Sequence, residues 1–441
     1  MRALASTTLA LLAGLWATPS AHAQTVTLTE TPREGECFRV VLETRLIGVL
    51  KVVRAGKTVP VKIVAKNDHL FVERILAGEA GGVQRAARRY EQAISVATVD
   101  GEKVERSLRE DRRLIVAQRT ADALVAFSPA GPLTRAEVEV VSEHFDTLPL
   151  IGLLPRKAIV VSDTWKISNA TAQAVCLFDG LISSDLTGTL KSATPAVAVV
   201  AIEGTAKGIE NGALATLSIS ATMKFDVTAG RIVAVEWKQK DVRDQGPITP
   251  AAEVETATTL TREFLPVEPK ELSKAALVAV PAEDETPGLL KQILHSDPKG
   301  RYQFLYSRDW HVVGQTDHHV VMRLLERGDF VAQVTITCWK PAGAGKHLSP
   351  EEFQKLVATS PGWEMEKVID RGEVPSDGDR WGYRITAQGD LDGVKVVQNF
   401  YVVASPAGEQ MIVTFTMKPA NLSRLGVRDL AIVNGLEWVA K

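Results

Sequence analysis

The segment ALATLSISATMKFDV, residues 213–227, sets the pattern for the first half of the chain. From Leu217 to Val227 every second residue is apolar or small, and the residues between them, such as Ser218 and Lys224, are polar. A period of two places the two kinds of side chain on opposite faces of a strand. We therefore expect a β-strand with one face in a core and the other in water.

Comparable strand-like segments extend outward from this one, from Cys37 to about residue 264. Gly56-Lys57 and Asp100-Gly101 have the composition of tight hairpin turns, so most neighbouring strands are expected to be antiparallel. The simplest architecture for this part is a large, curved, half-barrel-like antiparallel sheet.

Few helices interrupt these strands. Thr134 and Glu137 form a capping-box pattern that predicts a helix through about Phe145. A second short helix is expected to begin at Ser168 or Asn169. Both helices are expected to lie against the sheet.

Prolines divide residues 265–298 at short intervals, with an acidic run between two of them. Because proline removes a backbone donor and restricts the chain, neither a long helix nor a central strand is expected here. The segment is predicted to link an N-terminal domain, residues 24–264, to a C-terminal domain, residues 299–441. Residues 270–280 are apolar enough to lie along a domain surface, and residues 289–295 fit a short helix.

The first 23 residues have the composition of a secretory signal peptide. Arg2 precedes an apolar run from Leu9 to Trp16, and Ala21-His22-Ala23 has the small-x-small form of a cleavage site. The run is too short to span a bilayer, which takes roughly 18 apolar residues or more. Cleavage after Ala23 leaves no cysteine for a lipid anchor, so we expect a periplasmic or secreted protein.

The chain has only three cysteines, Cys37, Cys176 and Cys338, which are far apart in sequence. This spacing is not that of a disulfide-rich scaffold or a zinc ribbon. Cys37 and Cys176 are the only pair within one proposed domain, so they form the one possible disulfide considered. Cys338 is expected to be a small buried apolar residue.

Composition places the chain among ordinary globular proteins of two or three domains, with 441 residues, 45% hydrophobic, and a formal net charge of -2. Such a charge gives no long-range attraction for nucleic acid or an anionic membrane. The most basic patch is interleaved with acidic residues, so we expect an ion-paired sheet face there. Its arginines are Arg85, Arg88, Arg89, Arg106, Arg109, Arg112 and Arg113.

The common catalytic and nucleotide-binding motifs are missing: the sequence has no GxSxG, HExxH, CxxC, GxxxxGK[ST] or GxGxxG. His311, His318 and His319 are the best metal candidates, but adjacent strand residues point to opposite faces and do not readily share an ion. No metal site and no cofactor is therefore predicted.

Acidic residues were also considered as catalytic or metal-binding groups. Glu143, His144 and Asp146 lie close together, but neighbouring residues on a helix point in different directions. Asp390 with Asp392, and the similar pair at 377 and 379, lack the remaining ligands of a calcium loop and are expected to form turns. No catalytic residue is assigned, and the protein is predicted not to be an enzyme.

Several segments resemble a family of exported bacterial proteins of uncharacterised function. They include LIVAQR, FSPAGPLTR, SEHFDTLPLIGLLP, SDTWKIS, EWKQKDVRDQGP and the closing TTLTR, within residues 36–264. This resemblance implies export but no activity. The strand-rich layout also resembles, loosely and without a shared motif, the open half-barrel of LolA-type carriers of acylated proteins.

Beyond the linker, strand-like segments surround two helix signals. Ser349, Pro350 and Glu352 predict one helix, and Asn421 is expected to cap a final amphipathic helix. The order of elements over residues 299–441 resembles the PsbP-like αβα sandwich, which implies a docking module. The chain is thus assigned to the α+β class, mostly antiparallel β, with a large curved sheet followed by a smaller αβα sandwich.

These features favour an exported, non-catalytic binding or docking protein that engages a protein partner or a small apolar ligand through its sheets. One alternative is a periplasmic carrier of lipid or acylated protein, which requires an open, concave apolar face. A second alternative is a hydrolase, which requires a cleft that gathers His144, Asp146 or Asp163. No nucleic-acid partner and no membrane span are expected.

Overall fold

A computed structural model describes residues 25–54, 56–79, 82–120, 124–142, 145–282, 286–375 and 379–439. The predicted signal peptide, its cleavage site after Ala23, and residues Glu143, His144 and Asp377 lie outside these ranges. Within them, no helix is long and apolar enough to cross a membrane.

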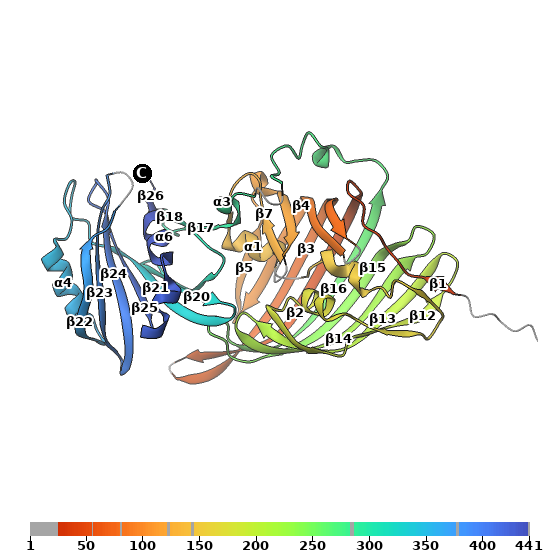
Figure 1. Ribbon diagram of the computed structural model, residues 1–441, viewed down its shortest axis with the longest axis horizontal. Coiled ribbons are helices and arrows are strands. Elements are labelled where there is room, and N and C mark those ends of the chain that lie inside the picture. The colour runs from red at the N-terminus through yellow and green to blue at the C-terminus, as the bar shows by residue number, and fades with distance from the viewer. Residues whose placement is uncertain are drawn as a thin grey trace, which may run out of the picture.

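A single large sheet dominates the N-terminal part, and Figure 1 shows it curving around the short helices. Its main path follows the order β10 (Thr164–Lys166), β12 (Thr187–Ala193), β13 (Val197–Glu210), β14 (Ala213–Asp226), β15 (Arg231–Arg243), β16 (Ala251–Leu265), β2 (Cys37–Arg54), β3 (Lys57–Glu79), β4 (Gly82–Val99), β6 (Leu114–Arg119) and β7 (Leu124–Phe127). Two strands lie off this path, β11 (Gly180–Ser184) beside β13 and β5 (Glu102–Ser107) beside β4. All these pairings are antiparallel, which confirms the predicted sheet.

Two distant strands meet in the middle of this sheet. Strand β16 pairs with β2 from Ala251–Lys51 to Leu265–Cys37. The closing segment predicted near residue 264 therefore returns to the first long strand of the domain.

The alternation that predicted β14 matches its burial. Leu217 and Met223 are buried, whereas Ser218 and Lys224 are exposed. The buried row continues across the sheet through Trp237 of β15 and Leu42 of β2. One face of the sheet is thus apolar along its length, as expected for an antiparallel sheet with one solvated face.

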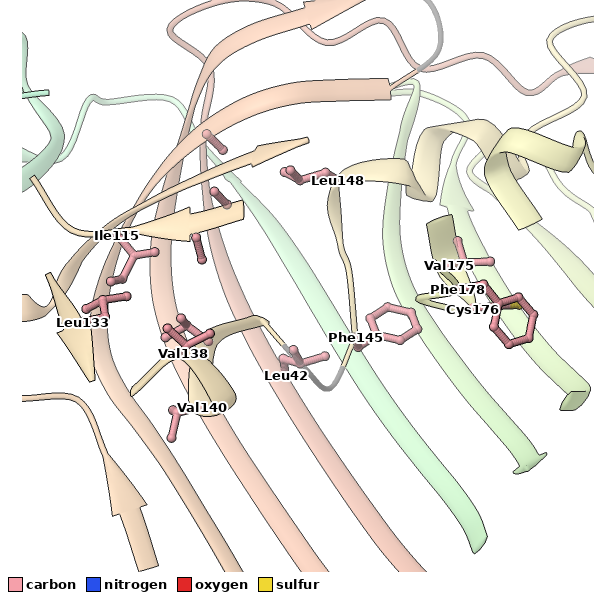
Figure 2. Packing of buried hydrophobic residues seen from close by; sticks show 14 of the residues in the cluster. Leu42, Ile115, Leu133, Val138, Val140, Phe145, Leu148, Val175, Cys176 and Phe178 are labelled. Carbon is pink, nitrogen blue, oxygen red and sulfur yellow. The ribbon is translucent and has the colours of Figure 1, made fainter. Parts of the chain in front are cut away.

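The concave, apolar face is filled by the protein's own chain. It is covered by α1 (Arg135–Ser142), the 3-10 helix η2 (Leu148–Leu153) and α2 (Asn169–Val175). Phe145 packs edge-on against Trp237 with ring centroids 5.7 Å apart, and Figure 2 shows Phe145, Leu148, Val175 and Phe178 lying over the strands. Each fully buried large side chain contributes about 2 kcal/mol by leaving water.

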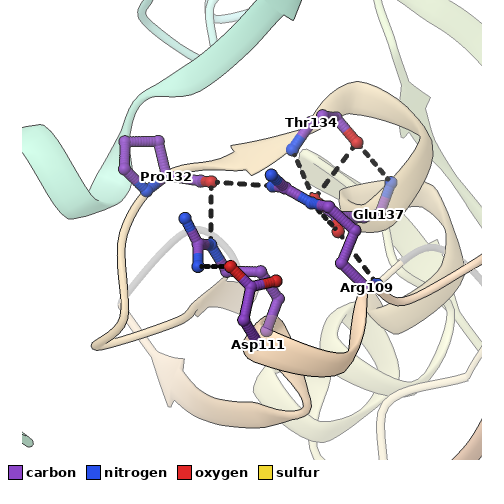
Figure 3. Close-up of polar contacts among 6 residues, drawn as sticks. Arg109, Asp111, Pro132, Thr134 and Glu137 are labelled. Carbon is purple, nitrogen blue, oxygen red and sulfur yellow. Dashed lines mark hydrogen bonds and ion pairs between the residues drawn. The ribbon is translucent and has the colours of Figure 1, made fainter.

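The capping box predicted before α1 is present. The Thr134 amide donates to Glu137 Oε2 (2.8 Å), and the Glu137 amide donates to Thr134 Oγ1 (3.3 Å). The Arg109 side chain donates two hydrogen bonds to the Glu137 carboxylate and the Arg109 amide donates a third, as Figure 3 shows. These contacts join η1 (Glu110–Arg112), which follows Arg109, to the start of α1.

The proline-rich segment lies on the protein surface. Its 3-10 helix η3 (Lys270–Leu272) buries Leu272 against Val72 and Ala87 on the outer face of the large sheet. Arg74 donates to the Leu272 carbonyl oxygen (2.9 Å) and pairs with Glu268 (2.6 Å). The segment therefore adds a small apolar contact to the outer face.

The end of the same segment enters a sheet that joins the two halves of the chain. A short helix, α3 (Gly288–Lys291), precedes β17 (Ile293–Ser296), whereas a helix alone was expected over residues 289–295. Strand β17 pairs in parallel with β8 (Leu133–Thr134), and antiparallel with β18 (Tyr302–Tyr306). Strand β26 (Glu437–Trp438) completes this sheet.

The C-terminal part contains an antiparallel sheet between helices (Figure 1). The strand order is β19 (Trp310–Gln315), β20 (His319–Glu326), β21 (Asp329–Trp339), β25 (Gln410–Met417), β24 (Val394–Ala404), β23 (Trp381–Leu391) and β22 (Trp363–Glu373). Helix α4 (Pro350–Ala358) packs on the face that contains Phe400. The opposite face contacts α5 (Leu422–Leu425) and α6 (Arg428–Gly435).

The last helix differs from its prediction. It is divided at Gly426, which adopts a positive φ of 59° and so ends α5. Asn421 makes no side-chain cap; its Nδ2 donates to the carbonyl oxygen of Val331 (3.1 Å). The remaining short elements are β1 (Val26–Thr27), paired with β9 (Ala158–Ile159), and the 3-10 helix η4 (Pro419–Asn421).

Candidate functional site

The three candidate histidines do not form a metal site. His319 is hydrogen-bonded to Thr316 and His318 is exposed, whereas burial lowers the pKa of His311 to about 4, with Arg135 adding to the effect. In the part of the chain that the structure describes, no group of three His, Cys, Asp or Glu residues could hold a metal ion.

The candidate acids are bound in separate structural contacts. Asp146 is buried, pairs with Arg119 and accepts from the Leu148 amide (2.9 Å); burial raises the pKa of Asp146, and Arg119 opposes this effect. Asp163 accepts from the Val160 amide (2.9 Å) in a turn. These two carboxylates serve local structure, which gives the hydrolase hypothesis no support.

The possible disulfide between Cys37 and Cys176 is not formed, because all three cysteines are free. Cys37 is paired across the ladder with Arg74, which is paired in turn with Ala87, and all three lie on the outer face of the sheet. Cys176 ends α2 within the core on the opposite, concave face, where burial raises the pKa of its thiol to about 12. The sheet separates the two sulfur atoms.

The arginine-rich patch is ion-paired, as predicted, although part of it is buried. Arg88 pairs with Glu73 at 2.8 Å, with both side chains almost fully buried. Arg106 pairs with Glu139 (3.0 Å), nearer the surface. The Arg106–Glu139 pair joins β5 to the covering helix α1, whereas the Arg88–Glu73 pair links two neighbouring strands of the sheet.

On the concave face of the large sheet, the cavity beneath α1 is small. The cavity beneath α1 has a volume of about 10 Å³, roughly the space that one water molecule needs. Leu42, Phe71 and Val141 are among its lining residues. An acyl chain would have to displace the helices that cover this face.

A cleft lies where the two halves of the chain meet, and we call it the junction groove. Its volume is about 580 Å³. Apolar residues dominate the lining: Leu289, Leu294, Leu305, Ala431 and Ile432. The linker helix α3, strands β17 and β18, and helix α6 supply these side chains.

Polar groups lie around the apolar lining of the junction groove. Arg112 and Pro132 come from the N-terminal part, and Arg112 Nε donates to the Pro132 carbonyl oxygen (3.4 Å). Arg428 of α6 lines the groove from the C-terminal part and pairs with Glu326 (2.8 Å). Such a cleft can enclose an apolar body and orient it by a few polar contacts.

The turn between β18 and β19 fixes the groove in place. Arg308 donates from Nη2 to the Ala126 carbonyl oxygen (2.6 Å) and from Nε to the Lys291 carbonyl oxygen (2.8 Å). It therefore joins β7, the end of α3 and the C-terminal part. Together with the β8–β17 pairing, this contact preorganises the groove.

A second cavity, of about 660 Å³, also borders this turn. Its lining includes charged residues of both signs: Asp179 and Asp309 are acidic, and Arg308 and Arg327 are basic. Because acids and bases alternate around it, no single charge of ligand is favoured. The junction groove is the stronger candidate.

The sequence analysis did not identify the groove residues. The segment YQFLY, residues 302–306, could have indicated part of the groove. Tyr302, Phe304 and Tyr306 lie on one face of this strand, and the apolar residue Leu305 lies on the other. A strand that is apolar on both faces is usually covered on both. No periodicity in the sequence indicates that α6 and α3 flank that second face.

No family model matches this chain, and neither does any curated protein sequence. Cyanobacterial PsbP (CyanoP) from Synechocystis sp. PCC 6803 is similar over 33% of this chain and 92% of its own, at 14% identity and a TM-score of 0.26. The Ran-binding protein Mog1p of Saccharomyces cerevisiae matches 34% of this chain and 95% of its own, at 11% identity and a TM-score of 0.26. Lipovitellin matches 54% of this chain and 26% of its own, at 8% identity and a TM-score of 0.32.

These similarities are weak and carry no functional argument. The first of them covers about a third of the chain, and the resemblance of residues 299–441 to PsbP-like domains stays a prediction. None of the three is a LolA-type carrier, so that part of the sequence resemblance stays a prediction.

Proposed function

We propose that this protein is an exported, non-catalytic binding protein whose ligand, small and mainly apolar, occupies the junction groove. One observation carries the proposal: a cleft of about 580 Å³ with an apolar lining and a few polar groups, built from both halves of the chain. That volume lies within the range of small-molecule sites, roughly 300 to 1,000 Å³, which favour domain interfaces. Export is proposed from the first 23 residues.

The alternatives need rearrangements or groups that the geometry does not favour. A lipid carrier would have to expel α1 and η2 from the concave face, breaking the buried contacts of Asp146 and Arg88. A hydrolase would need an acid and a base in one cleft, whereas Asp146 and Asp163 hold separate turns.

The test is to fill the groove. Ala431 is an exposed residue of α6 that lines it, so Ala431→Trp should block the cleft without disturbing the core. The apolar fluorescent probe 1-anilinonaphthalene-8-sulfonate should bind the wild-type protein and bind this variant at least tenfold more weakly. Ala358→Trp, at an exposed position on α4 outside the groove, is the matched control.

Solvent extraction of the purified protein followed by mass spectrometry should also yield a small apolar compound from the wild type and less of it from Ala431→Trp. Equal probe binding by both tryptophan variants would refute the groove as the site. Recovery of phospholipid or acyl chains in equal amounts from all three proteins would favour the carrier instead.

A further inference from the structure

The β2–β3 hairpin has an unusual composition. From Arg45 to Lys66 the chain contains no acidic and no aromatic residue. Apolar side chains separate its basic residues, which are Arg45, Lys51, Arg54, Lys57, Lys62 and Lys66. The near-neutral charge of the whole chain conceals this local excess of positive charge.

The hairpin extends beyond its neighbours in the sheet. Strands β2 and β3 pair without interruption as far as Arg54 and Lys57. Strand β16 stops opposite Lys51, and β4 stops opposite Ile63. The end of the hairpin therefore projects from the large sheet, at its lower left edge in Figure 1.

The outer face of the hairpin exposes aliphatic side chains. Ile47 and Val64 are directly opposite each other in the ladder and are 55% and 54% exposed. Val53, on the same face because it is an even number of residues from Ile47, is 60% exposed. On the other face Val61 is only 2% exposed. The exposed aliphatic residues thus lie on the outer face alone, so their exposure does not result from poor packing of the whole hairpin.

Two shallow grooves cross this outer face, with volumes of about 520 and 590 Å³. Both include Ile47, Lys240 and Glu255 in their lining, so they adjoin along β2, β16 and β15. In contrast to the junction groove, they belong to the large sheet alone.

Basic residues outnumber acidic ones around these grooves. Arg45, Lys51, Lys62, Lys238 and Lys240 line them, against Glu253 and Glu255. Lys51 pairs with Glu253 (2.6 Å), and at the tip Arg54 pairs with Asp100 (3.1 Å). Within the described ranges, Lys57, Lys62 and Lys238 form no ion pair, and all three are exposed.

We infer that the outer face of the β2–β3 hairpin docks on an anionic lipid bilayer. Aliphatic side chains enter the interfacial region of a bilayer, and lysines around them reach the anionic headgroups with their extended stems. A nucleic acid is disfavoured because the segment lacks aromatic residues on which bases could stack. The hairpin tip and the adjoining grooves together supply both the apolar and the charged part of such a contact.

Vesicle co-sedimentation of the mature, full-length protein tests this inference. The protein should bind vesicles of equal parts phosphatidylglycerol and phosphatidylcholine, and should bind pure phosphatidylcholine at least tenfold more weakly. Lys62→Glu/Lys238→Glu, at two lysines that line the grooves, and, separately, Ile47→Ser/Val53→Ser should each reduce binding to the anionic vesicles at least fivefold. These residues are exposed, and unchanged circular dichroism melting curves will establish that each variant is folded.

The control is Lys207→Glu/Lys224→Glu, which reverses the charge of two exposed lysines on the outer face of the same sheet but outside the hairpin. This control changes the net charge by the same amount as the double lysine variant in the hairpin region. Its binding to the anionic vesicles should stay within twofold of wild type. Ala431→Trp should also bind vesicles normally, which separates this inference from the junction groove. No binding to anionic vesicles, equal binding to both lipids, or equal loss in the control would overturn the inference.

Discussion

Asp241 should destabilise the protein at neutral pH, and replacing it by asparagine should therefore stabilise the fold. Asp241 lies on β15 and is 7% exposed, and its Oδ1 has no hydrogen-bond partner among the described residues. Burial, and then the nearby Glu210, raise the pKa of Asp241 from 3.8 to about 6, while Arg243 acts in the opposite direction. Arg243 is already paired with Glu210 (2.5 Å).

The sign of the effect follows from the direction of this shift. A carboxyl with a raised folded-state pKa binds its proton more tightly in the folded protein than in the unfolded chain. The penalty is absent below about pH 3.8, grows as the pH rises, and is complete above about pH 6. A shift of about two pKa units corresponds to about 3 kcal/mol at pH 7.5.

Asp241→Asn should thus raise the free energy of unfolding by about 1 to 3 kcal/mol at pH 7.5 and by much less at pH 4, because the neutral amide avoids the buried charge. Urea unfolding followed by tryptophan fluorescence at both pH values measures this. Asp244→Asn, at an exposed position next to the end of β15, is the control and should change stability little. A stabilisation that is equal at the two pH values, or a loss of stability at pH 7.5, would refute the reasoning.

Two further predictions concern buried contacts. Arg88→Ala should lower the free energy of unfolding by about 3 to 5 kcal/mol, because it leaves the buried Glu73 carboxylate unpaired. The double variant Arg88→Met/Glu73→Leu should lose less stability. Urea titration measures both losses, and an equal or greater loss in the double variant would contradict this explanation. Arg308→Ala should loosen the junction by removing the hydrogen bonds to the carbonyl oxygens of Ala126 and Lys291, and so speed tryptic cleavage after Lys291 several-fold. Mass spectrometry of timed digests measures that rate, and an unchanged rate would show that Arg308 does not hold the junction.

The parts of the fold that were predictable are those controlled by near neighbours in sequence. The alternation from Leu217 to Val227 predicted both the strand and its buried face. Ser349 with Glu352, and Thr134 with Glu137, predicted two helix starts, because a capping box is complete within four residues.

Features that depend on distant segments could not be predicted in this way. The parallel pairing of Ile293 with Leu133 joins a predicted linker to a two-residue strand, and nothing local indicates it. Cys37 and Cys176 lie in one predicted domain, yet they are on opposite faces of the sheet. The junction groove has the same origin, since Leu305 and Ala431 meet only after the two halves have packed.

The pairing of β2 with β16 has a consequence for how the chain is made. A chain synthesised from its N-terminus presents β2 long before residue 265 arrives, and until then the middle of the sheet has two unpaired edges. Such long edges are templates for pairing with other chains. Protection from aggregation before synthesis reaches β16 must then come from outside the sheet, and fragments that end before Ala251 should be far more prone to association than the whole protein.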